Sequence, residues 1–261
     1  QHPFLCAKWV RGLVTPADGW AMAYVDFSGQ ELAIAAALSG DVAMLDAYAT
    51  GDFYIQFAIH AGAAPAGATK ASHPRERNLF KSVAIAVLYG ISSHGLALSI
   101  GASVVEAQSL LERHKAAFPR FHAWREGVVN HALVHRRLTA PLGWQIQFAT
   151  DDLNLRSIMN WPVQSTGSEM LRAALVRLED GGVTVLTPVH DAVLIEAPVD
   201  EIEDAVRLAQ EAMSRAARDV LGEAVGMRSD AQVVLPGQSF LPPASQGMWD
   251  AVTRAIGGTH A

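Results

Sequence analysis

The stretch at residues 77–90, RNLFKSVAIAVLYG, decides how the rest of this chain is interpreted. Pro74 precedes it and Gly90 ends it, and these residues are typical of the first turn and of the end of a helix. Most positions between them are apolar, as in a helix that packs against protein on several sides. One stripe of the predicted helix repeats every fourth residue and consists of Arg77, Lys81, Ile85 and Tyr89.

This stripe carries two cations one turn apart, followed by an aromatic side chain near the helix end. An Arg guanidinium binds phosphate oxygens through its fork of donors, and a Lys ammonium binds them as a point charge. An aromatic ring beyond the cations suits contact with a flat ring. The stripe therefore predicts a polyphosphate site. Taken alone, however, two cations at this spacing more often belong to the solvated face of a surface helix. The choice between the two interpretations therefore depends on the rest of the sequence.

Length and composition set broad limits. With 261 residues the chain is long enough for one large domain or two smaller ones. Hydrophobic residues make up 50% and charged residues 18%, which is ordinary for a soluble globular protein. The net charge of -6 argues against a dedicated nucleic-acid coat. It still permits a local basic cleft, because phosphate contacts depend on where the cations lie.

The cysteine content points to a reducing compartment. Cys6 is the single cysteine, which excludes an internal disulfide framework. The sequence has no apolar run of spanning length and no signal peptide, so we expect a cytoplasmic protein. Gln1 in place of an initiating Met indicates a fragment of a longer protein. No Cys/His cluster suggests zinc, and the scattered histidines are interpreted as solvated: His73, His114, His131 and His135.

The first half of the chain predicts a strand followed by many helices. Residues 20–27 form an apolar run of strand length that ends near Asp26. Helical patterns follow at 31–38, at 42–61 with a Gly-Asp interruption at 51–52, at 103–117 and at 120–136. Residues 62–74 have the composition of a loop, and the turn at Pro141 and Gly143 predicts a hairpin.

The last third predicts a hairpin between two helices. The sequence from Thr166 to Glu169 is a capping box, so we expect a helix to open there and to end at 181–182. Apolar runs at 183–189 and 192–197 predict two strands joined by His190 and Asp191. Asp200 then precedes a helix at 201–221, and 231–235 predicts a further strand. The fold class is therefore mixed α/β (α+β), with the helical middle inserted in a sheet-bearing unit.

Two acids, Asp26 and Asp191, lie at the tips of predicted strands. Paired carboxylates at strand ends can hold two Mg²⁺ ions about 3.5–4 Å apart, the arrangement used for in-line phosphoryl transfer. Taken singly, each acid is more often a cap or a turn residue. Taken together with the cationic helix, they favour nucleotidyl transfer.

Three motifs, in this order along the chain, resemble those of a known family. DFSGQEL at 26–32, R-x3-K-x7-YG at 77–90 and VHD at 189–191 resemble the polymerase signatures of the family A DNA polymerases, the family of bacterial DNA polymerase I. The resemblance runs from about Arg11 to Leu235 and is strongest to phage and proteobacterial relatives that lack the acid after His-Asp. It implies a right-hand fold with a palm at 1–45 and 151–261, inserted helical fingers at 46–150, and no thumb.

The resemblance also implies roles for individual residues. Asp26 and Asp191 would be catalytic and would bind two Mg²⁺ ions together with the Phe27 carbonyl. Lys81, also catalytic, and Arg77 would hold the triphosphate of the incoming nucleotide. Further nucleotide contacts would come from Tyr89 near the templating position, from Glu31 beneath the sugar, where it excludes a 2′-hydroxyl, and from Ile85 and Gln30.

A second segment would contact the primer–template. R-x3-N-x-P-x-Q, here Arg156, Asn160, Pro162 and Gln164, matches the family's primer–template segment, and His190 would touch the primer end. Alternatively, Asn160 and Gln164 cap a turn before the helix that starts at Thr166, and the residues alone leave both interpretations open.

The chain also departs from the family pattern. The family's Gln after the first-motif Ser is Gly29, its Arg after Glu-Leu is Ala33, its aromatic four residues past the Lys is Ile85, and its acid after His-Asp is Ala192. None of these changes removes a metal-binding Asp, so we expect catalysis. Because only 25 residues precede Asp26, we expect the family's thumb and any proofreading domain to lie outside these residues. They would come either from a trimmed part of the same protein or from a separate thumb, exonuclease or clamp protein.

The resemblance implies a template-directed DNA polymerase core that adds deoxynucleotides to a primer 3′ end by two-metal nucleotidyl transfer. Its partners would be primer–template DNA and deoxynucleoside triphosphates, without a membrane. The alternative is a polymerase-like module that binds primer–template or nucleotide with little turnover. A His-Asp metal phosphohydrolase needs further His and Asp ligands that the sequence does not provide at helical spacing.

Overall fold

A computed structural model of the chain describes residues 7–148, 154–223 and 225–257. It divides into two compact units, each built from separate stretches of the sequence. The sheet unit consists of Gln1–Ser28, Leu171–Ala216 and Arg228–Ala261, and the helical unit of Gly29–Met170 and Ala217–Met227. These boundaries differ from those expected for palm and fingers, at 45/46 and 150/151, and the assignment of the two names stays a prediction.

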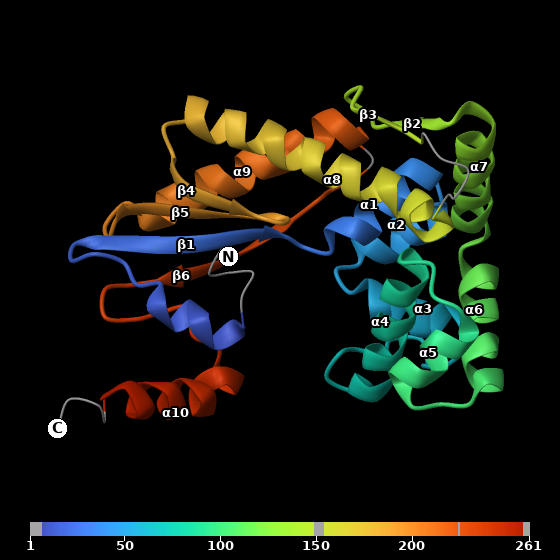
Figure 1. Cartoon of the computed structure of the whole chain (residues 1–261), viewed down its shortest axis with the longest axis horizontal. Helices are drawn as coiled ribbons and strands as arrows, with labels where there is room; N and C mark the ends of the chain where they lie inside the picture. The colour runs from blue at the N-terminus through green and yellow to red at the C-terminus, as the bar shows by residue number, and fades with distance from the viewer. Residues whose placement is uncertain (1–6, 149–153, 224, 258–261) are drawn as a thin grey trace. The chain divides into compact units, whose positions relative to one another are not determined.

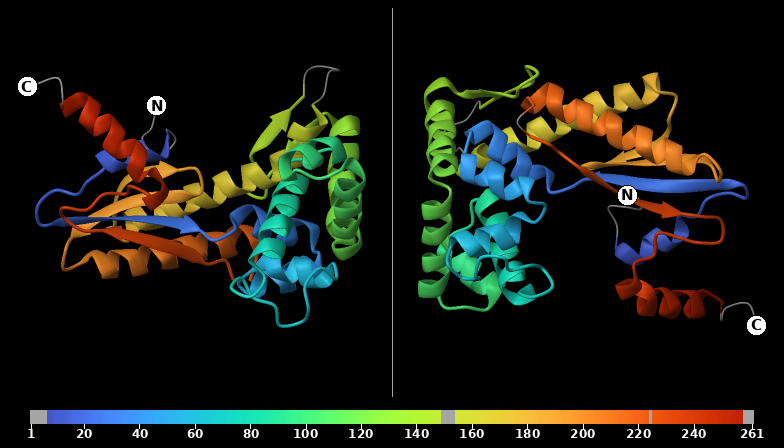
Figure 2. Two further views of the ribbon diagram at one scale, coloured as in Figure 1. Left: turned by 90° about the horizontal axis from the view of Figure 1, so that it is seen from below. Right: turned by 180° about the vertical axis from the view of Figure 1, so that it is seen from behind.

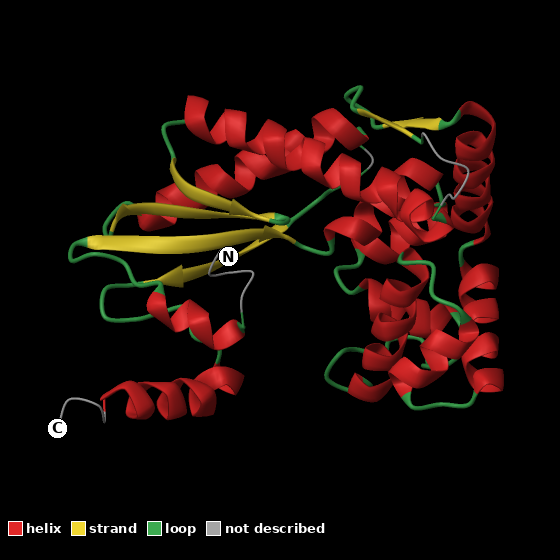
Figure 3. Ribbon diagram, in the orientation of Figure 1, coloured by secondary structure: helices red, strands yellow, loops and turns green. Residues whose placement is uncertain are grey.

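A four-stranded antiparallel sheet organises the sheet unit (Figures 1 and 3). Its strand order is β4-β5-β1-β6, which places the N-terminal strand between strands from the end of the chain. The strands are β1 (Trp20–Phe27), β4 (Thr184–Val189), β5 (Ala192–Pro198) and β6 (Ser229–Val234). All four predicted strands are therefore confirmed, with ends that shift by one or two residues.

Strand β1 is covered on both of its faces. Alternate residues from Ala21 to Phe27 are buried, as expected for a strand whose side chains point to opposite faces in turn. On the opposite face, Met22 and Tyr24 pack against a cluster that includes Leu194 and Phe240. The central position of β1 thus follows from apolar residues on both of its sides.

Helices flank this sheet on two sides. The second part of α8 (Leu155–Asp180), from Leu171, and α9 (Ile202–Leu221) as far as Ala216 run along one side. Helices η2 (Lys8–Leu13) and α10 (Gln246–Gly257) lie on the other side (Figures 1 and 2). A Cβ on Gly12 would lie 2.6 Å from the Trp249 ring, so glycine lets η2 approach α10 closely. A short 3-10 turn, η3 (Pro243–Ser245), leads into α10.

The helical unit contains the predicted helical middle of the chain. Its elements are α1 (Gln30–Ser39), α2 (Val42–Ala49), α3 (Phe53–His60), α4 (Pro74–Leu88), α5 (Ser93–Ile100), α6 (Val104–Ala117), α7 (Pro119–His135), β2 (Arg137–Thr139), β3 (Gln145–Gln147) and the first part of α8. Strands β2 and β3 confirm the predicted hairpin. Helix α5, which starts at the Ser92 cap, was not predicted.

The core of the helical unit is rich in phenylalanine. Phe57 contacts Phe80 edge-on, with ring centroids 4.7 Å apart, and Phe53 stacks on Phe118 at 5.4 Å. These side chains come from α3, α4 and the start of α7, so aromatic packing fixes α3 against its neighbours. Among the described residues, no helix is long and apolar enough to cross a membrane.

Two sequence-based interpretations are wrong. Thr166 does not open a helix: α8 already begins at Leu155 and continues through Pro162, whose carbonyl accepts a hydrogen bond from Thr166 Oγ1 at 2.6 Å. Glu169 is not part of a capping box either, because its carboxylate accepts hydrogen bonds from the backbone N–H groups of Leu142 and Trp144 in the β2–β3 turn. Its partners lie 25 and 27 residues away, beyond the reach of a local pattern.

The interpretation of His114 as solvated is also wrong. Its side chain is buried among aromatic rings of the helical unit, and its Nδ1 lies 3.0 Å from His122 Nε2. His131 and His135 are exposed, as predicted.

Candidate functional site

Two predicted catalytic acids come together at one end of the sheet. Asp26 is the penultimate residue of β1, and Asp191 lies in the turn between β4 and β5. The backbone N–H of Phe27 donates to the Asp191 carbonyl at 3.1 Å. His190 has a left-handed φ of 55°, which allows this tight turn to place Asp191 next to β1.

The sheet register places a third acid beside them. Asp26 lies opposite Ala192 on β5 and opposite Asp230 on β6. Directly opposed residues of antiparallel strands share one face, with Cβ atoms about 4.5–5.5 Å apart. Ser28 Oγ donates to Asp230 Oδ2 at 2.6 Å, which holds this exposed carboxylate. Asp230 was missed because the predicted strand began one residue after it, and cross-strand neighbours cannot be read from a sequence without a register.

The three carboxylates concentrate negative charge. The pKa of Asp26 is raised to about 6, first by burial and then by the charges of Asp191 and Asp230. The pKa of Tyr24, which precedes Asp26 on the same face of β1, is raised by burial and by Asp191 and Asp26. His190 Nδ1 lies 3.4 Å from Asp191 Oδ1, and its side chain is exposed. Such a site favours a cation from outside the protein.

The donor atoms at this end of the sheet fit Mg²⁺. Asp26, Asp191 and the Phe27 carbonyl supply the oxygen ligands that Mg²⁺ prefers. In the part of the chain that the structure describes, no group of three or more His, Cys, Asp or Glu side chains is arranged to hold a metal ion alone. Mg²⁺ in nucleotide-processing sites is usually held by one or two carboxylates, with substrate phosphates completing its shell. The residues present therefore fit a metal shared with a substrate.

The predicted triphosphate site lies in the helical unit. Arg77 and Lys81 project from α4 beside Tyr54 of α3. Arg77 Cζ lies 5.2 Å, and Lys81 Nζ 5.6 Å, from the centroid of the Tyr54 ring. Arg77 Nε donates to Asp52 Oδ2 at 2.5 Å. The sequence showed the two cations but neither Asp52, which looked like a helix break, nor Tyr54, because α3 and α4 are separated by a loop.

A second cluster of the helical unit surrounds Glu31. Glu31 Oε1 accepts hydrogen bonds from the Tyr89 hydroxyl and from Gln164 Nε2, both at 2.5 Å. Three predicted site residues from α1, the end of α4 and α8 are thus in contact. Gly90, with φ of 66°, ends α4, and a Cβ there would lie 3.0 Å from Met159 of α8. Glycine therefore lets the end of α4 pack against α8 and bring Tyr89 to Glu31.

The remaining predicted residues lie on α8 and α1. Arg156, Asn160 and Gln164 recur every four residues on one stripe of α8. They lie inside the helix, so the alternative that Asn160 and Gln164 cap a turn is wrong. Gln30 is buried, and a Cβ on Gly167 would lie 2.7 Å from its Oε1, so α1 and α8 pack closely. Among the described residues, neither Asn160 Oδ1 nor Gln30 Nε2 has a hydrogen-bond partner. Ile85 is partly buried on α4.

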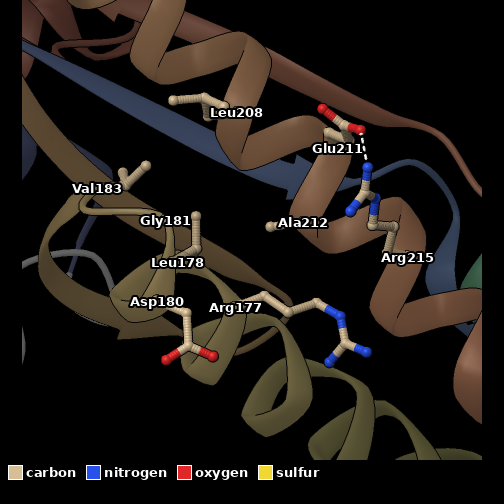
Figure 4. A pocket seen from close by; sticks show the side chains of 9 residues that line it. All are labelled: Arg177, Leu178, Asp180, Gly181, Val183, Leu208, Glu211, Ala212 and Arg215. Carbon is tan, nitrogen blue, oxygen red and sulfur yellow. Dashed lines mark hydrogen bonds and ion pairs between the residues drawn. The ribbon is translucent and has the colours of Figure 1, made fainter.

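A separate pocket of about 390 Å³ lies in the sheet unit between α8 and α9 (Figure 4). Leu178, Val183 and Leu208 give it an apolar lining, and Glu211 pairs with Arg215 at its edge. None of its lining residues was predicted to be functional.

The chain combines carboxylates at neighbouring strand ends with a cationic helix elsewhere in the sequence. This combination is typical of enzymes that transfer phosphoryl groups with divalent metals. Comparison with known proteins shows the family to which the chain belongs. The family model for DNA polymerase family A matches residues 6–233. The chain belongs to this family, as the three sequence motifs predicted.

Its relatives include the thermostable DNA polymerase I of Thermus aquaticus, which is 31% identical over 218 residues, 78% of this chain and 26% of that protein. DNA polymerase I of Geobacillus stearothermophilus is 28% identical over 223 residues, 79% of this chain and 25% of that protein. The chain thus spans about a quarter of the length of these relatives.

A solved structure confirms the predicted fold class. The POL domain of Pol1 from M. smegmatis, in complex with DNA primer-template and dNTP, superposes with a TM-score of 0.77. The match covers 91% of this chain and 43% of that one at 24% identity. The mixed helix-and-sheet fold is therefore that of a family A polymerase domain.

Proposed function

We propose that the chain is the catalytic core of a template-directed DNA polymerase, which adds deoxynucleotides to a primer 3′ end in the cytoplasm. The observation that carries the proposal is the meeting of Asp26 and Asp191 at one end of the sheet. Membership of DNA polymerase family A supports it, as do relatives named DNA polymerase I. We assign the sheet to the palm and the helical middle of the chain to the fingers.

The carboxylates of the sheet unit would hold the metal ions. Two Mg²⁺ ions on Asp26, Asp191 and the Phe27 carbonyl would activate the primer 3′-hydroxyl and neutralise the leaving pyrophosphate. Asp26 has to be ionised to act as a ligand, and the raised pKa of about 6 leaves it mostly ionised at neutral pH. His190, exposed beside Asp191, is proposed to contact the primer end.

The helical unit would hold the nucleotide and the template. Arg77 and Lys81 would bind the triphosphate, and Tyr89 would lie near the templating base. Glu31, fixed by two hydrogen bonds, would fill the space of a 2′-hydroxyl. Further contacts are proposed for Ile85 and Gln30 with the nucleotide, and for Arg156, Asn160 and Gln164 with the primer–template.

A primer-extension assay with Mg²⁺ tests this function. We expect the parent chain to extend a labelled primer opposite a template, and Asp26→Asn to lose extension while it still binds the duplex. Asp204→Asn is the matched control, because Asp204 is an exposed carboxylate of the same unit that pairs with Arg207 on α9. Duplex or nucleotide binding by the parent without any extension would favour the alternative, a binding module with little turnover.

A further inference from the structure

We propose that Asp52 and Tyr54 are positioning residues that hold the Arg77 and Lys81 side chains in place to bind the triphosphate of a nucleoside triphosphate. This inference rests on the proposed function, because it takes the two cations as the triphosphate site. It assigns a role to the start of α3, which packs against α4 in the helical unit (Figure 1).

Asp52 is fixed by both of its carboxylate oxygens. Oδ1 accepts the backbone N–H of Ile55 at 3.3 Å and so caps α3, while Oδ2 accepts Arg77 Nε at 2.5 Å. The carboxylate thus ties the N-terminus of α3 to the middle of α4. The side chains of Arg77 and Asp52 are 16% and 23% exposed, so water screens this pair less than a surface ion pair.

The hydrogen bond to Asp52 orients the Arg77 guanidinium but occupies only one of its N–H donors. A guanidinium carries one N–H at Nε and four at its terminal nitrogens. Only the Nε group donates to Asp52. The terminal nitrogens, the groups that bind phosphate in bidentate fashion, can therefore turn toward an anion while Asp52 holds the opposite edge.

Tyr54 supports both cations at once. Arg77 and Lys81 are one turn apart on α4, and like charges at this spacing repel each other. The Tyr54 ring lies within about 6 Å of both, the range in which a ring face attracts a cation. It is held there by its neighbours, since Phe53 and Ile55 are buried in the core of the unit. The ring and Asp52 thus offset the repulsion that would otherwise separate the two cations.

Asparagine at position 52 separates the two roles of Asp52. Asn is as good a helix cap as Asp, but its oxygen would be occupied by Ile55, and its NH₂ cannot accept a hydrogen bond from Arg77. For Asp52→Asn we expect the KM for dTTP to rise about five- to tenfold, since misplaced binding groups lose affinity, while kcat and duplex affinity change less than about twofold. Tyr54→Leu should give a similar rise, whereas Tyr54→Phe keeps the ring and should behave like the parent.

A double variant tests whether Asp52 acts through Arg77. The Kd of dTTP for the chain with primer–template and Ca²⁺ is measured by calorimetry for Asp52→Asn, Arg77→Ala and both together. If Asp52 positions Arg77, the double variant binds dTTP no more weakly than Arg77→Ala alone. Glu126→Gln serves as the control, because it removes a carboxylate from another ion pair of the same unit, in which Glu126 Oε1 lies 3.8 Å from Lys115 Nζ.

The results separate two kinds of failure. An unchanged dTTP affinity in Arg77→Ala would overturn the proposed triphosphate site, and the present inference with it. A weakened Arg77→Ala with an unchanged Asp52→Asn would overturn the positioning role alone. Additive losses in the double variant would also overturn it, because Asp52 would then act without Arg77.

Discussion

The two units differ in how their charged side chains are partnered. In the sheet unit, burial and then the charges of Asp191 and Asp230 raise the pKa of Asp26, so three like charges lie close together. In the helical unit, Arg77 has a carboxylate partner in Asp52, and the Glu31 carboxylate accepts two hydrogen bonds. Under the proposed function, the sheet unit would take its balancing cation from outside the protein, while residues of the helical unit would already be arranged around an anion.

The largest expected effect is in the sheet unit. Asp26→Ala and Asp191→Ala should each reduce nucleotide incorporation by at least about a thousandfold, because each removes a metal ligand. Asp230→Ala removes a carboxylate from the same cluster, but one that Ser28 already holds, and should cost less than about tenfold. Single-turnover primer extension measures all three, with circular dichroism to check folding. Equal losses in the three variants would show that total charge matters and not the two ligands.

The next effect is in the helical unit and concerns the nucleotide alone. Lys81→Ala should lower kcat/KM for deoxynucleotides about ten- to a hundredfold, since one charge-assisted contact is worth about 1.5–3 kcal/mol. Duplex affinity should stay within about twofold if the cation meets only the triphosphate. Lys115→Ala, an exposed Lys of α6, is the control. A loss of duplex affinity with normal nucleotide kinetics would contradict the assignment of α4.

A smaller effect is expected in nucleotide selection. Glu31→Ala should raise the incorporation of ribonucleotides relative to deoxynucleotides at least about tenfold, because it empties the space of a 2′-hydroxyl. Glu31→Gln keeps the size of the side chain and an oxygen acceptor for Tyr89 and Gln164, so it should retain most of the selection. Competition between the two nucleotide types at one template position measures the ratio. An unchanged ratio in Glu31→Ala would mean that another residue excludes the ribose.

Sequence patterns predicted the parts of the fold that depend on near neighbours. The apolar run of β1 and the Pro74 and Gly90 limits of α4 were recognised within a residue or two. The capping box at Thr166 failed for a physical reason: Glu169 binds backbone groups of the distant β2–β3 turn. Helix α5 was missed because its eight residues, SHGLALSI, contain a glycine and weak helix formers beside a Ser cap.

In the candidate site, too, the residues marked by a local feature were predicted and those defined by distant contacts were not. Asp26 and Asp191 were predicted because the end of a strand is a local feature. Asp230 and Asp52 were not predicted, since each acquires its role from a partner on another element: Asp26 across the β1–β6 register, and Arg77 across α3 and α4. Contacts of this kind depend on tertiary structure, and local patterns in a single sequence do not reveal which distant residues will meet.

The smallest expected effect is on stability, and it has opposite signs in the two units. In the helical unit, burial lowers the pKa of His122 to about 4, with Arg125 and Lys115 adding to the effect. Burial also lowers the pKa of His114 well below its usual value, followed by the charges of His122 and Arg125, while Asp41 acts in the other direction on His122. Below pH 6.5 the unfolded chain binds protons that the folded unit does not, so its stability falls as the pH drops toward 4.

In the sheet unit, the folded pKa of Asp26 is about 6 and so lies above the unfolded value of 3.8. The folded unit therefore binds more protons than the unfolded chain between these values, and it gains stability as the pH falls through this window. Asp26 is partly exposed, so solvent screening keeps the gain small. Asp26→Asn should raise the melting temperature by about 2–4 °C at pH 8 and leave it unchanged near pH 4.

His122→Gln tests the opposite sign in the helical unit. The variant removes one titrating ring, so between pH 7 and 5 it should lose fewer degrees of melting temperature than the parent, in which we expect a drop of at least about 5 °C. Hydrogen exchange followed by mass spectrometry assigns the change to a unit. At pH 5, peptides from α6 and α7 should be better protected in His122→Gln than in the parent, while peptides from β1 and β5 should not differ. Equal protection of both sets would show that the buried histidines do not cause the acid sensitivity, and the contrast between the units would then rest on Asp26 alone.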